Sequence, residues 1–178
     1  IALDNPVMPT ARPPPPTPSG QQFGVNLAFL RPVNTGNIRQ SDTEDARKYG
    51  GEKALDGTPA TYWMPGESSR SGRGPSTPVF EIDAEGPLVI DALTISEPTG
   101  IANIRAYKIE GMVDSDYTLL AEGTSIGVRK THTFPEITVW KIRLTIMQSD
   151  GAPAICELTM HRRTNHGLPG GGSVAVFN

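Results

Sequence analysis

Apolar and polar residues alternate with a period of two along much of residues 88–162, and this pattern constrains the fold more than any other feature of the chain. Successive side chains of a β-strand point to opposite faces, so such alternation is typical of a half-buried antiparallel strand. The stretch "VWKIRLTIM" is a clear example, because four apolar residues are predicted to share its buried face: Trp140, Ile142, Leu144 and Ile146. The fold should therefore be built mainly from strands.

Further short strands are predicted on both sides of this one. The inward residues are predicted to be Val89, Leu93 and Ile95 in "LVIDALTISEP", Tyr107, Ile109 and Val113 in "NIRAYKIEGMV", and Cys156, Leu158 and Met160 in "AICELTMHR". The stretches "DYTLLAEGTSIG" and "KTHTFPEI" are predicted to add strands joined by glycine turns, whereas helix is limited to a possible turn near Ala46–Ala54. This pattern predicts an all-β fold, and we expect an antiparallel jelly-roll β-sandwich.

The two ends of the chain differ in composition from its middle. Residues 1–22 contain "TARPPPPTPSG", a proline block expected to be extended, and we interpret them as a linker or tail rather than a ligand for a proline-binding groove. Residues 164–178 form a glycine-rich tail. The 178 residues suffice for about one domain, which we place at residues 23–163. Because the chain begins with Ile and lacks a signal-peptide pattern, we expect a processed piece of a longer protein.

Charge and motifs exclude several classes of function. The net charge is −3 and the basic residues are scattered, so neither nucleic-acid binding nor attachment to a membrane surface is expected. No apolar run approaches the roughly 18 residues of a membrane-spanning helix. Neither a Gly-x-Ser-x-Gly nor a His-Glu-x-x-His motif is present. Cys156 is the only cysteine, so no intrachain disulfide is possible, and we expect it to be a small core residue.

The three histidines do not suggest a metal site. His132, His161 and His166 lack the spacing of metal ligands, and the stretch "HRRTNH" mixes two of them with two arginines. We therefore expect His161 and His166 to lie at a solvated end of a strand.

The stretch "GGEKALDGTPATYWMP" places an acid, a hydroxyl and two aromatic residues in one short segment. Asp56 and the glycine after it predict a turn, because Asp hydrogen-bonds the backbone two residues on and Gly tolerates positive φ. This turn should aim Asp56 and Thr61 at one small space. Trp63 could stack on a sugar, but a large aromatic residue here is more simply explained by core packing, and we expect the same of Trp140.

Several motifs in order carry a family resemblance. They are "NLAFLRPV", "YGGEKALDGTPATYW", "LTISEPTGIANIRAYKIEG", "YTLLAEGTSIG", "FPEITVWKIRLTI" and "PAICELTMH". Their spacing over residues 25–162 resembles a discoidin domain, the coagulation factor V/VIII C-type module, whose galactose-binding-like fold is shared by family 32 carbohydrate-binding modules. The run from "SEP" to "GTSIG" is most similar to the C-terminal β-sandwich of family 29 α-L-fucosidases.

The resemblance also implies what this chain cannot do alone. Family 29 fucosidases carry their two catalytic carboxylates on a barrel domain, and no segment here has the alternating strand and helix pattern of such a barrel. We therefore expect the chain not to be an enzyme, although it could be an accessory module of a glycoside hydrolase.

For the turn, the resemblance implies a structural calcium ion. Its ligands would be the backbone carbonyls of Lys53, Thr58 and Cys156, the carboxylates of Asp56 and Glu157, and the hydroxyl and carbonyl of Thr61. All of these are oxygen atoms, which Ca²⁺ prefers and Zn²⁺ or copper do not. The alternative is that Asp56 only caps the turn and Glu157, which the alternation turns away from the core, is an exposed strand residue.

A ligand site is expected on the long loop "MPGESSRSGRGPST" at residues 64–77. Loops beyond about twelve residues are uncommon in compact domains and are often functional or disordered. The candidates here are Glu67, Arg70 and Arg73, which could pair with vicinal sugar hydroxyls, and the second choices are Asn103 and Arg105. The alternative is that the loop is merely solvated.

Two classes of function stay open. The first is a non-catalytic module that binds fucose- or galactose-type glycans and belongs to a secreted, fucosidase-like protein. The second is a structural or adhesion module that binds a partner protein in an extracellular or cell-surface assembly. Phospholipid binding is disfavoured, because the long loop offers only Met64 and Pro65 as apolar residues.

Overall fold

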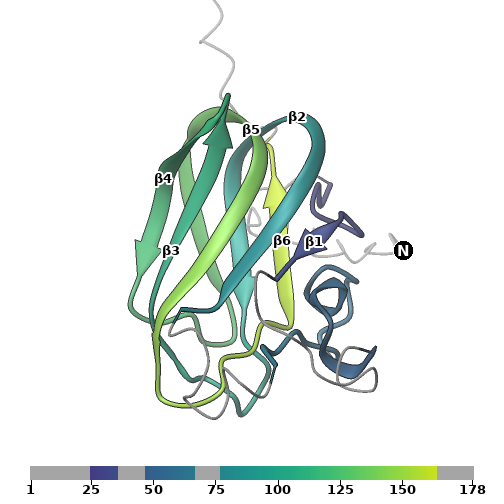
Figure 1. Ribbon diagram of the computed structural model, residues 1–178, viewed down its shortest axis with the longest axis vertical. Helices are drawn as coiled ribbons and strands as arrows, with labels where there is room; N and C mark the ends of the chain where they lie inside the picture. Colours follow the sequence, from purple (N-terminus) through teal and green to yellow (C-terminus); the bar gives the residue numbers. More distant parts are fainter. Residues whose placement is uncertain (1–24, 36–46, 67–76, 164–178) are drawn as a thin grey trace, which may run out of the picture.

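The computed structural model describes residues 25–35, 47–66 and 77–163 (Figure 1). Its elements are β1 (Val33–Asn34), the 3₁₀ turn η1 (Gly51–Ala54), β2 (Val79–Ser96), β3 (Ile104–Val113), β4 (Asp116–Gly123), β5 (Lys130–Ser149) and β6 (Glu157–His161). All strand pairings among them are antiparallel, so the predicted all-β antiparallel sandwich is confirmed. No helix in these described ranges is long and apolar enough to cross a membrane.

The two longest strands, β2 and β5, build both layers of the sandwich. The first part of β2 pairs with the last part of β5 (Glu81 opposite Arg143), and this layer continues to β1 on one side and to β3 and β4 on the other. The second part of β2 pairs with the first part of β5 (Leu93 opposite His132) and with β6. Figure 1 shows β2 and β5 arching between the layers, and the register of this pair shifts between Asp83 and Leu88.

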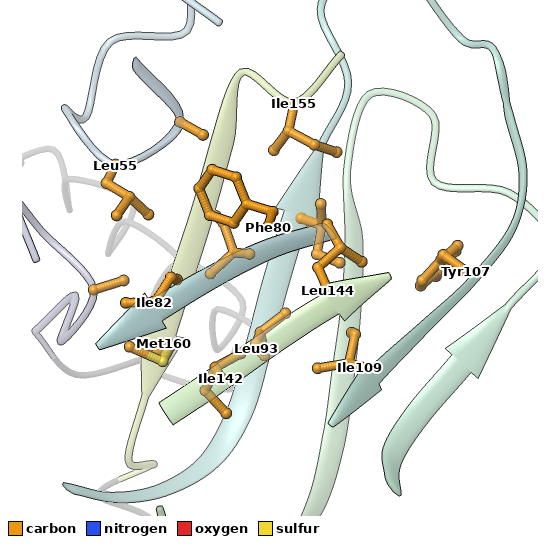
Figure 2. Packing of buried hydrophobic residues seen from close by; sticks show 14 of the residues in the cluster. Leu55, Phe80, Ile82, Leu93, Tyr107, Ile109, Ile142, Leu144, Ile155 and Met160 are labelled. Carbon is orange, nitrogen blue, oxygen red and sulfur yellow. The ribbon is translucent and has the colours of Figure 1, made fainter. Parts of the chain in front are cut away.

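The core lies between these layers (Figure 2). Residues predicted to point inward from three strands are buried there: Leu93, Ile95, Tyr107, Ile109, Leu158 and Met160. Trp63 is fully buried, with its ring centroid 5.2 Å from that of Phe80, so its prediction as a core residue is confirmed. Cys156 is also buried, as expected.

Trp140 does not belong to the core, and its predicted place there is wrong. Its side chain is 42% exposed, whereas Val139 beside it is fully buried. The cause is the register shift in the β2–β5 pair, where the three residues 139–141 of β5 are opposite the six residues 83–88 of β2. Simple alternation fails across such an irregularity, so the buried face restarts at Ile142.

His161 also differs from its prediction. It is only 7% exposed, and its Nε2 atom lies 2.9 Å from the hydroxyl of Thr159, so it is not at a solvated strand end. His132 is held by the hydroxyl of Tyr107, 2.8 Å from its Nε2. The pKa of His132 is lowered by burial and, to a lesser extent, by the charge of Lys130. His166 lies outside the described residues.

Candidate functional site

The turn at residues 53–61 brings four of the predicted calcium ligands together. The hydroxyl oxygen of Thr61 lies 2.7 Å from Asp56 Oδ2, 2.9 Å from the carbonyl oxygen of Thr58 and 3.4 Å from that of Lys53. The Thr58 amide donates to Asp56 Oδ1 at 2.9 Å, which is the predicted Asp turn, and Gly57 has a φ of 72°. The turn follows η1, and η1 contributes the Lys53 carbonyl to this group of oxygen atoms.

These oxygen atoms outnumber the protons that could join them. A threonine hydroxyl has one proton and can donate it to only one acceptor at a time. Three different acceptor groups, from Lys53, Asp56 and Thr58, surround this one hydroxyl. A cluster of oxygen atoms with too few donors is an arrangement that a cation would stabilise.

Glu157, at the start of β6, adds a second feature that would fit a cation. It pairs with Ser96 and points away from the core, as predicted, but both of its carboxylate oxygens are buried, so it is not an exposed strand residue. Neither oxygen has a hydrogen-bond partner within the described part of the chain. The amide of Gly57 is near enough to lower the pKa slightly, but it does not meet hydrogen-bond geometry.

The electrostatics of Glu157 agree with its geometry. Burial raises its pKa from 4.5 to about 7, and the negative charge of Asp56 contributes to the rise. Asp56 therefore lies near enough for its charge to act on Glu157, although the two residues lie in distant parts of the sequence. Two carboxylates that repel each other in a buried site favour a cation between them.

The fit to calcium is good for five of the six predicted residues. Two carboxylates, a hydroxyl and backbone carbonyls are the oxygen ligands that Ca²⁺ takes. No group of three or more His, Cys, Asp or Glu that could hold a metal lies within the described ranges, so a cation here would depend on neutral oxygens. Cys156 is the exception: its thiol donates to the carbonyl of Ser96 at 3.4 Å, and no described contact places its own carbonyl beside the other ligands.

The predicted sugar-binding residues are only partly described. Glu67, Arg70 and Arg73 lie outside the described residues. Asn103 donates through Nδ2 to the carbonyl of Ala152 at 3.1 Å, and Arg105 forms an ion pair with Asp150 at 2.6 Å. Both side chains therefore connect the start of β3 to the loop after β5.

A cavity of about 410 Å³ adjoins the turn, and no local sequence pattern predicts it. Its floor is formed by Thr94 and Ser96 of β2 and by Glu157 and Thr159 of β6, and its rim includes Gly57 and Pro59 of the turn. Thr94 pairs with Thr159 and Ser96 with Glu157, so the floor is one compact patch of polar side chains. The sequence shows each strand's polar face, but only the pairing of β2 with β6 shows that these faces adjoin.

Solved structures with a similar fold include three proteins with bound sugars. A family 32 carbohydrate-binding module from Clostridium perfringens NanJ, in complex with galactose, is 22% identical with a TM-score of 0.62; the match covers 74% of this chain and 93% of that one. A chitosan-binding module from a Paenibacillus chitosanase/glucanase, in complex with chitotriose, is 21% identical with a TM-score of 0.63. The match covers 76% of this chain and 99% of that one.

The third is a family 29 fucosidase of Ruminococcus gnavus in complex with fucose, 26% identical with a TM-score of 0.65. The match covers 79% of this chain but only 27% of the fucosidase, so the chain spans about a quarter of that enzyme. A search of curated proteins gave no significant match. Residues 37–158 match the family model of the F5/8 type C domain, and because they make up more than half of the chain, the protein belongs to this family.

Proposed function

We propose that this chain is a non-catalytic carbohydrate-binding module that serves as an accessory domain of a glycan-active protein outside the cell. The observation that carries the proposal is the extent of the structural matches. The fold unit corresponds to 93% of a module solved with galactose and 99% of one solved with chitotriose, but to only about a quarter of a fucosidase. The unit thus matches whole sugar-binding modules, and hydrolysis would be the task of another domain.

The proposed role of calcium is structural. An ion held by Asp56, Glu157, Thr61 and the carbonyls of Lys53 and Thr58 would tie the turn to the start of β6. It would supply positive charge that satisfies the oxygen atoms described above. We use the name calcium clasp for these five residues. The clasp would fix the turn from which the chain continues to Trp63 and the loop at residues 64–77.

A glycan array tests the sugar-binding function. We expect weak, saturable binding to fucose- or galactose-terminated glycans, with dissociation constants that are micromolar to millimolar. Binding should be lost in the double variant Arg70→Ala and Arg73→Ala if the loop at residues 64–77 forms the site. Arg162→Ala is the matched control, since Arg162 lies on an exposed surface and pairs only with Glu136 in the described structure. No binding to any glycan would refute the proposal.

The alternative function, binding to a partner protein, is supported by one observation. Three apolar side chains near the start of the described chain are exposed: Val25, Phe29 and Leu30. Leu30 has a φ of 54°, a strained conformation for this residue. Two results together would favour this alternative: no glycan on the array is bound, and a partner protein binds the intact chain but not the Leu30→Ser variant.

A further inference from the structure

We propose that the cavity between the turn and the outer face of β2 and β6 is a second ligand site, which binds one small, neutral, polyhydroxylated ring such as a monosaccharide. This inference relies on the proposed function for the class of ligand. The cavity itself, and its separation in sequence from the loop at residues 64–77, come from the described structure. We call it the β2–β6 cavity.

The floor of the β2–β6 cavity is rich in hydroxyl groups with defined orientations. Thr94 and Thr159 are opposite each other on paired strands, where side chains lie about 5 Å apart. The hydroxyl of Thr94 lies 2.9 Å from that of Thr131, and the hydroxyl of Thr159 lies 2.9 Å from Nε2 of His161. A hydroxyl has one donor and two acceptor positions, so each of these groups can still bind a ligand while its existing partner holds it in place.

Asn26 adds a donor to the wall of the cavity. Its Oδ1 atom accepts hydrogen bonds from the amides of Ala28 at 2.9 Å and of Met160 at 3.3 Å, which fixes the orientation of the side-chain amide. No contact within the described residues engages its Nδ2 group. Two N–H donors are therefore available for ligand hydroxyls in a preformed geometry.

The rim of the cavity combines apolar and charged side chains. Val128 is 74% exposed, an unusual position for an aliphatic side chain, and Pro59 lies on the turn. Arg129 follows Val128 on the rim and can donate to two adjacent hydroxyls. A sugar ring has both apolar C–H faces and polar edges, so it could contact both kinds of group.

The loops that bear the rim are held in place from beneath. The buried carboxylate of Glu97 accepts hydrogen bonds from the amides of Asn103 and Ile104 through Oε1 and from the amide of Gly127 through Oε2. One side chain thus fixes the loop after β2 and the loop before β5. The residue next to Gly127 is Val128, so the rim is positioned before any ligand binds.

Size and charge define the class of ligand. Small-molecule sites usually occupy about 300–1,000 Å³, so a cavity of about 410 Å³ suits a single ring rather than a long oligosaccharide. Two carboxylates, of Glu97 and Glu157, line the cavity against one cation, Arg129. Glu97 already accepts three backbone amides and Glu157 belongs to the calcium clasp, so the groups left for a ligand are hydroxyls, the Asn26 amide and Arg129. These groups suit the hydroxyls of a neutral polyol.

The test is a titration of the intact, isotope-labelled chain with methyl glycosides of fucose, galactose and N-acetylglucosamine, followed by amide chemical shifts. We expect at least one sugar to cause saturable shifts at Thr94–Glu97 and Glu157–Thr159. The double variant Thr94→Val and Thr159→Val keeps the side-chain shape but removes two hydroxyls, and should weaken binding about tenfold. The matched control is Thr118→Val with Thr138→Val, which alters exposed threonines on other strands.

A rim variant guards against a folding defect in the floor variant. Val128→Ser with Arg129→Gln changes only exposed loop residues and should also weaken binding. Shifts confined to residues 64–77, or equal binding by both cavity variants, would overturn the cavity proposal and leave the proposed function intact. Absence of shifts with all three sugars would overturn the cavity proposal as well, while the glycan array would decide the proposed function separately.

Discussion

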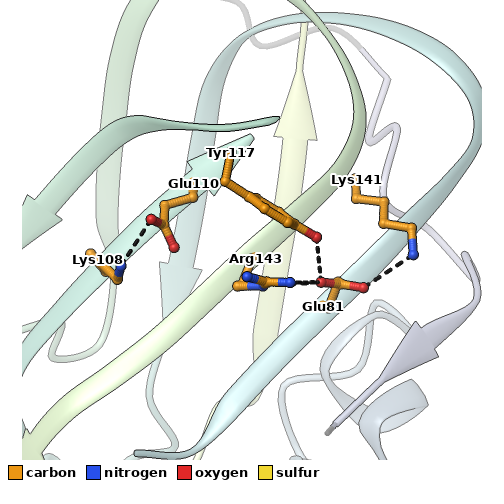
Figure 3. A network of polar contacts seen from close by, with 6 residues as sticks. All are labelled: Glu81, Lys108, Glu110, Tyr117, Lys141 and Arg143. Atoms are coloured by element: carbon orange, nitrogen blue, oxygen red, sulfur yellow. Dashed lines mark hydrogen bonds and ion pairs between the residues drawn. The ribbon is translucent and has the colours of Figure 1, made fainter. Parts of the chain in front are cut away.

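Glu81 and Glu157 are both partly covered glutamates on paired strands, yet their surroundings are opposite. Glu81 accepts hydrogen bonds from Tyr117 at 2.5 Å, Arg143 at 2.8 and 3.0 Å, and Lys141 at 3.2 Å (Figure 3). Arg143 also stacks on the ring of Tyr117, 3.6 Å from its centroid. The buried oxygens of Glu157 have no such partner in the described residues. The comparison separates a carboxylate whose oxygens are satisfied by neighbouring side chains from one whose buried oxygens have no hydrogen-bond partner among the described residues.

Their pKa values move in opposite directions because side chains donate hydrogen bonds to Glu81 and not to Glu157. Burial would raise the pKa of Glu81, but its hydrogen bonds from Tyr117, Arg143 and Lys141 outweigh this and lower it. Burial raises the pKa of Glu157, and nothing among the described residues offsets most of that rise. The Glu81 carboxylate thus stabilises the fold when ionised, whereas the Glu157 carboxylate destabilises it unless a cation is bound.

The largest expected effect concerns the core that supports both regions. Trp63→Ala should lower the free energy of unfolding by about 3–5 kcal/mol, because it removes a fully buried ring that packs on Phe80. Trp140→Ala is the matched control and should cost less than about 1 kcal/mol, since this ring is largely outside the core. Chemical denaturation of both variants measures the difference. Similar losses of stability in the two variants would contradict the placement of Trp63 inside the core and of Trp140 outside it.

The next effect tests the calcium clasp. Calcium at a hundred times its dissociation constant should stabilise the folded state by about 2.7 kcal/mol if it binds only that state. Asp56→Ala should abolish this gain, and so should Glu157→Gln, with the double variant little worse than either single one because both act at one site. Thermal unfolding with calcium and with a chelator measures the gain. Magnesium should substitute poorly, because it demands a more regular geometry.

A smaller effect is expected from Glu81→Gln, which should destabilise the fold by about 1–2 kcal/mol at neutral pH. The pKa of Glu81 is lowered in the folded state, so its stabilisation is present above the ordinary value of 4.5 and is lost as the pH falls through the folded value. The difference between variant and parent should therefore shrink in acid. Glu110→Gln is the control, because Glu110 pairs only with Lys108 in the network drawn in Figure 3. An equal loss of stability in the Glu81 and Glu110 variants would show that the hydrogen bonds to Glu81 do not stabilise the fold more than a surface ion pair does.

The remaining effect, in calcium-free protein, should have the opposite dependence on pH. In calcium-free protein the pKa of Glu157 is raised from 4.5 to about 7, so the folded state favours the protonated form. Stability should fall by up to about 3 kcal/mol as the pH rises from about 4.5 to 7 and then level off, because one pKa unit corresponds to about 1.4 kcal/mol. Glu157→Gln should remove this fall. If the melting temperatures of the parent and the variant change with pH in the same way, the Glu157 carboxylate is not buried without a hydrogen-bond partner.

The sequence predicts the regular strands well because their signal is local. The buried residues of β3 and β6 follow simple alternation, and the structure confirms Tyr107, Ile109, Leu158 and Met160 as core residues. The strand predicted from "LVIDALTISEP" covers only the second part of β2, and the first part, up to Pro87, is a finding of the structure. In the structure Glu85 and Gly86 have φ values of 56° and 149° within one continuous strand. The same irregularity explains why Trp140 was placed wrongly.

In the candidate site, too, the parts formed by residues close in sequence are predictable, and the parts formed by strand pairing are not. Lys53, Asp56, Thr58 and Thr61 are close in sequence, so the turn motif and the family resemblance suffice to predict that they meet. The burial of Glu157 and the β2–β6 cavity depend on strand pairing and on how the turn covers β6, and neither is written in a local pattern. His161 was misplaced for a similar reason, because its burial results from tertiary packing.

The most direct test of the contrast between the two glutamates is a calcium titration of the chelator-treated chain by isothermal calorimetry. The account predicts one calcium ion per chain for the parent and for Glu81→Gln, and no measurable binding for Glu157→Gln, with all three proteins shown to be folded. Absence of calcium binding by the parent, or undiminished binding by Glu157→Gln, would contradict it. In either case the unpartnered carboxylate of Glu157 would not be the ligand of a cation.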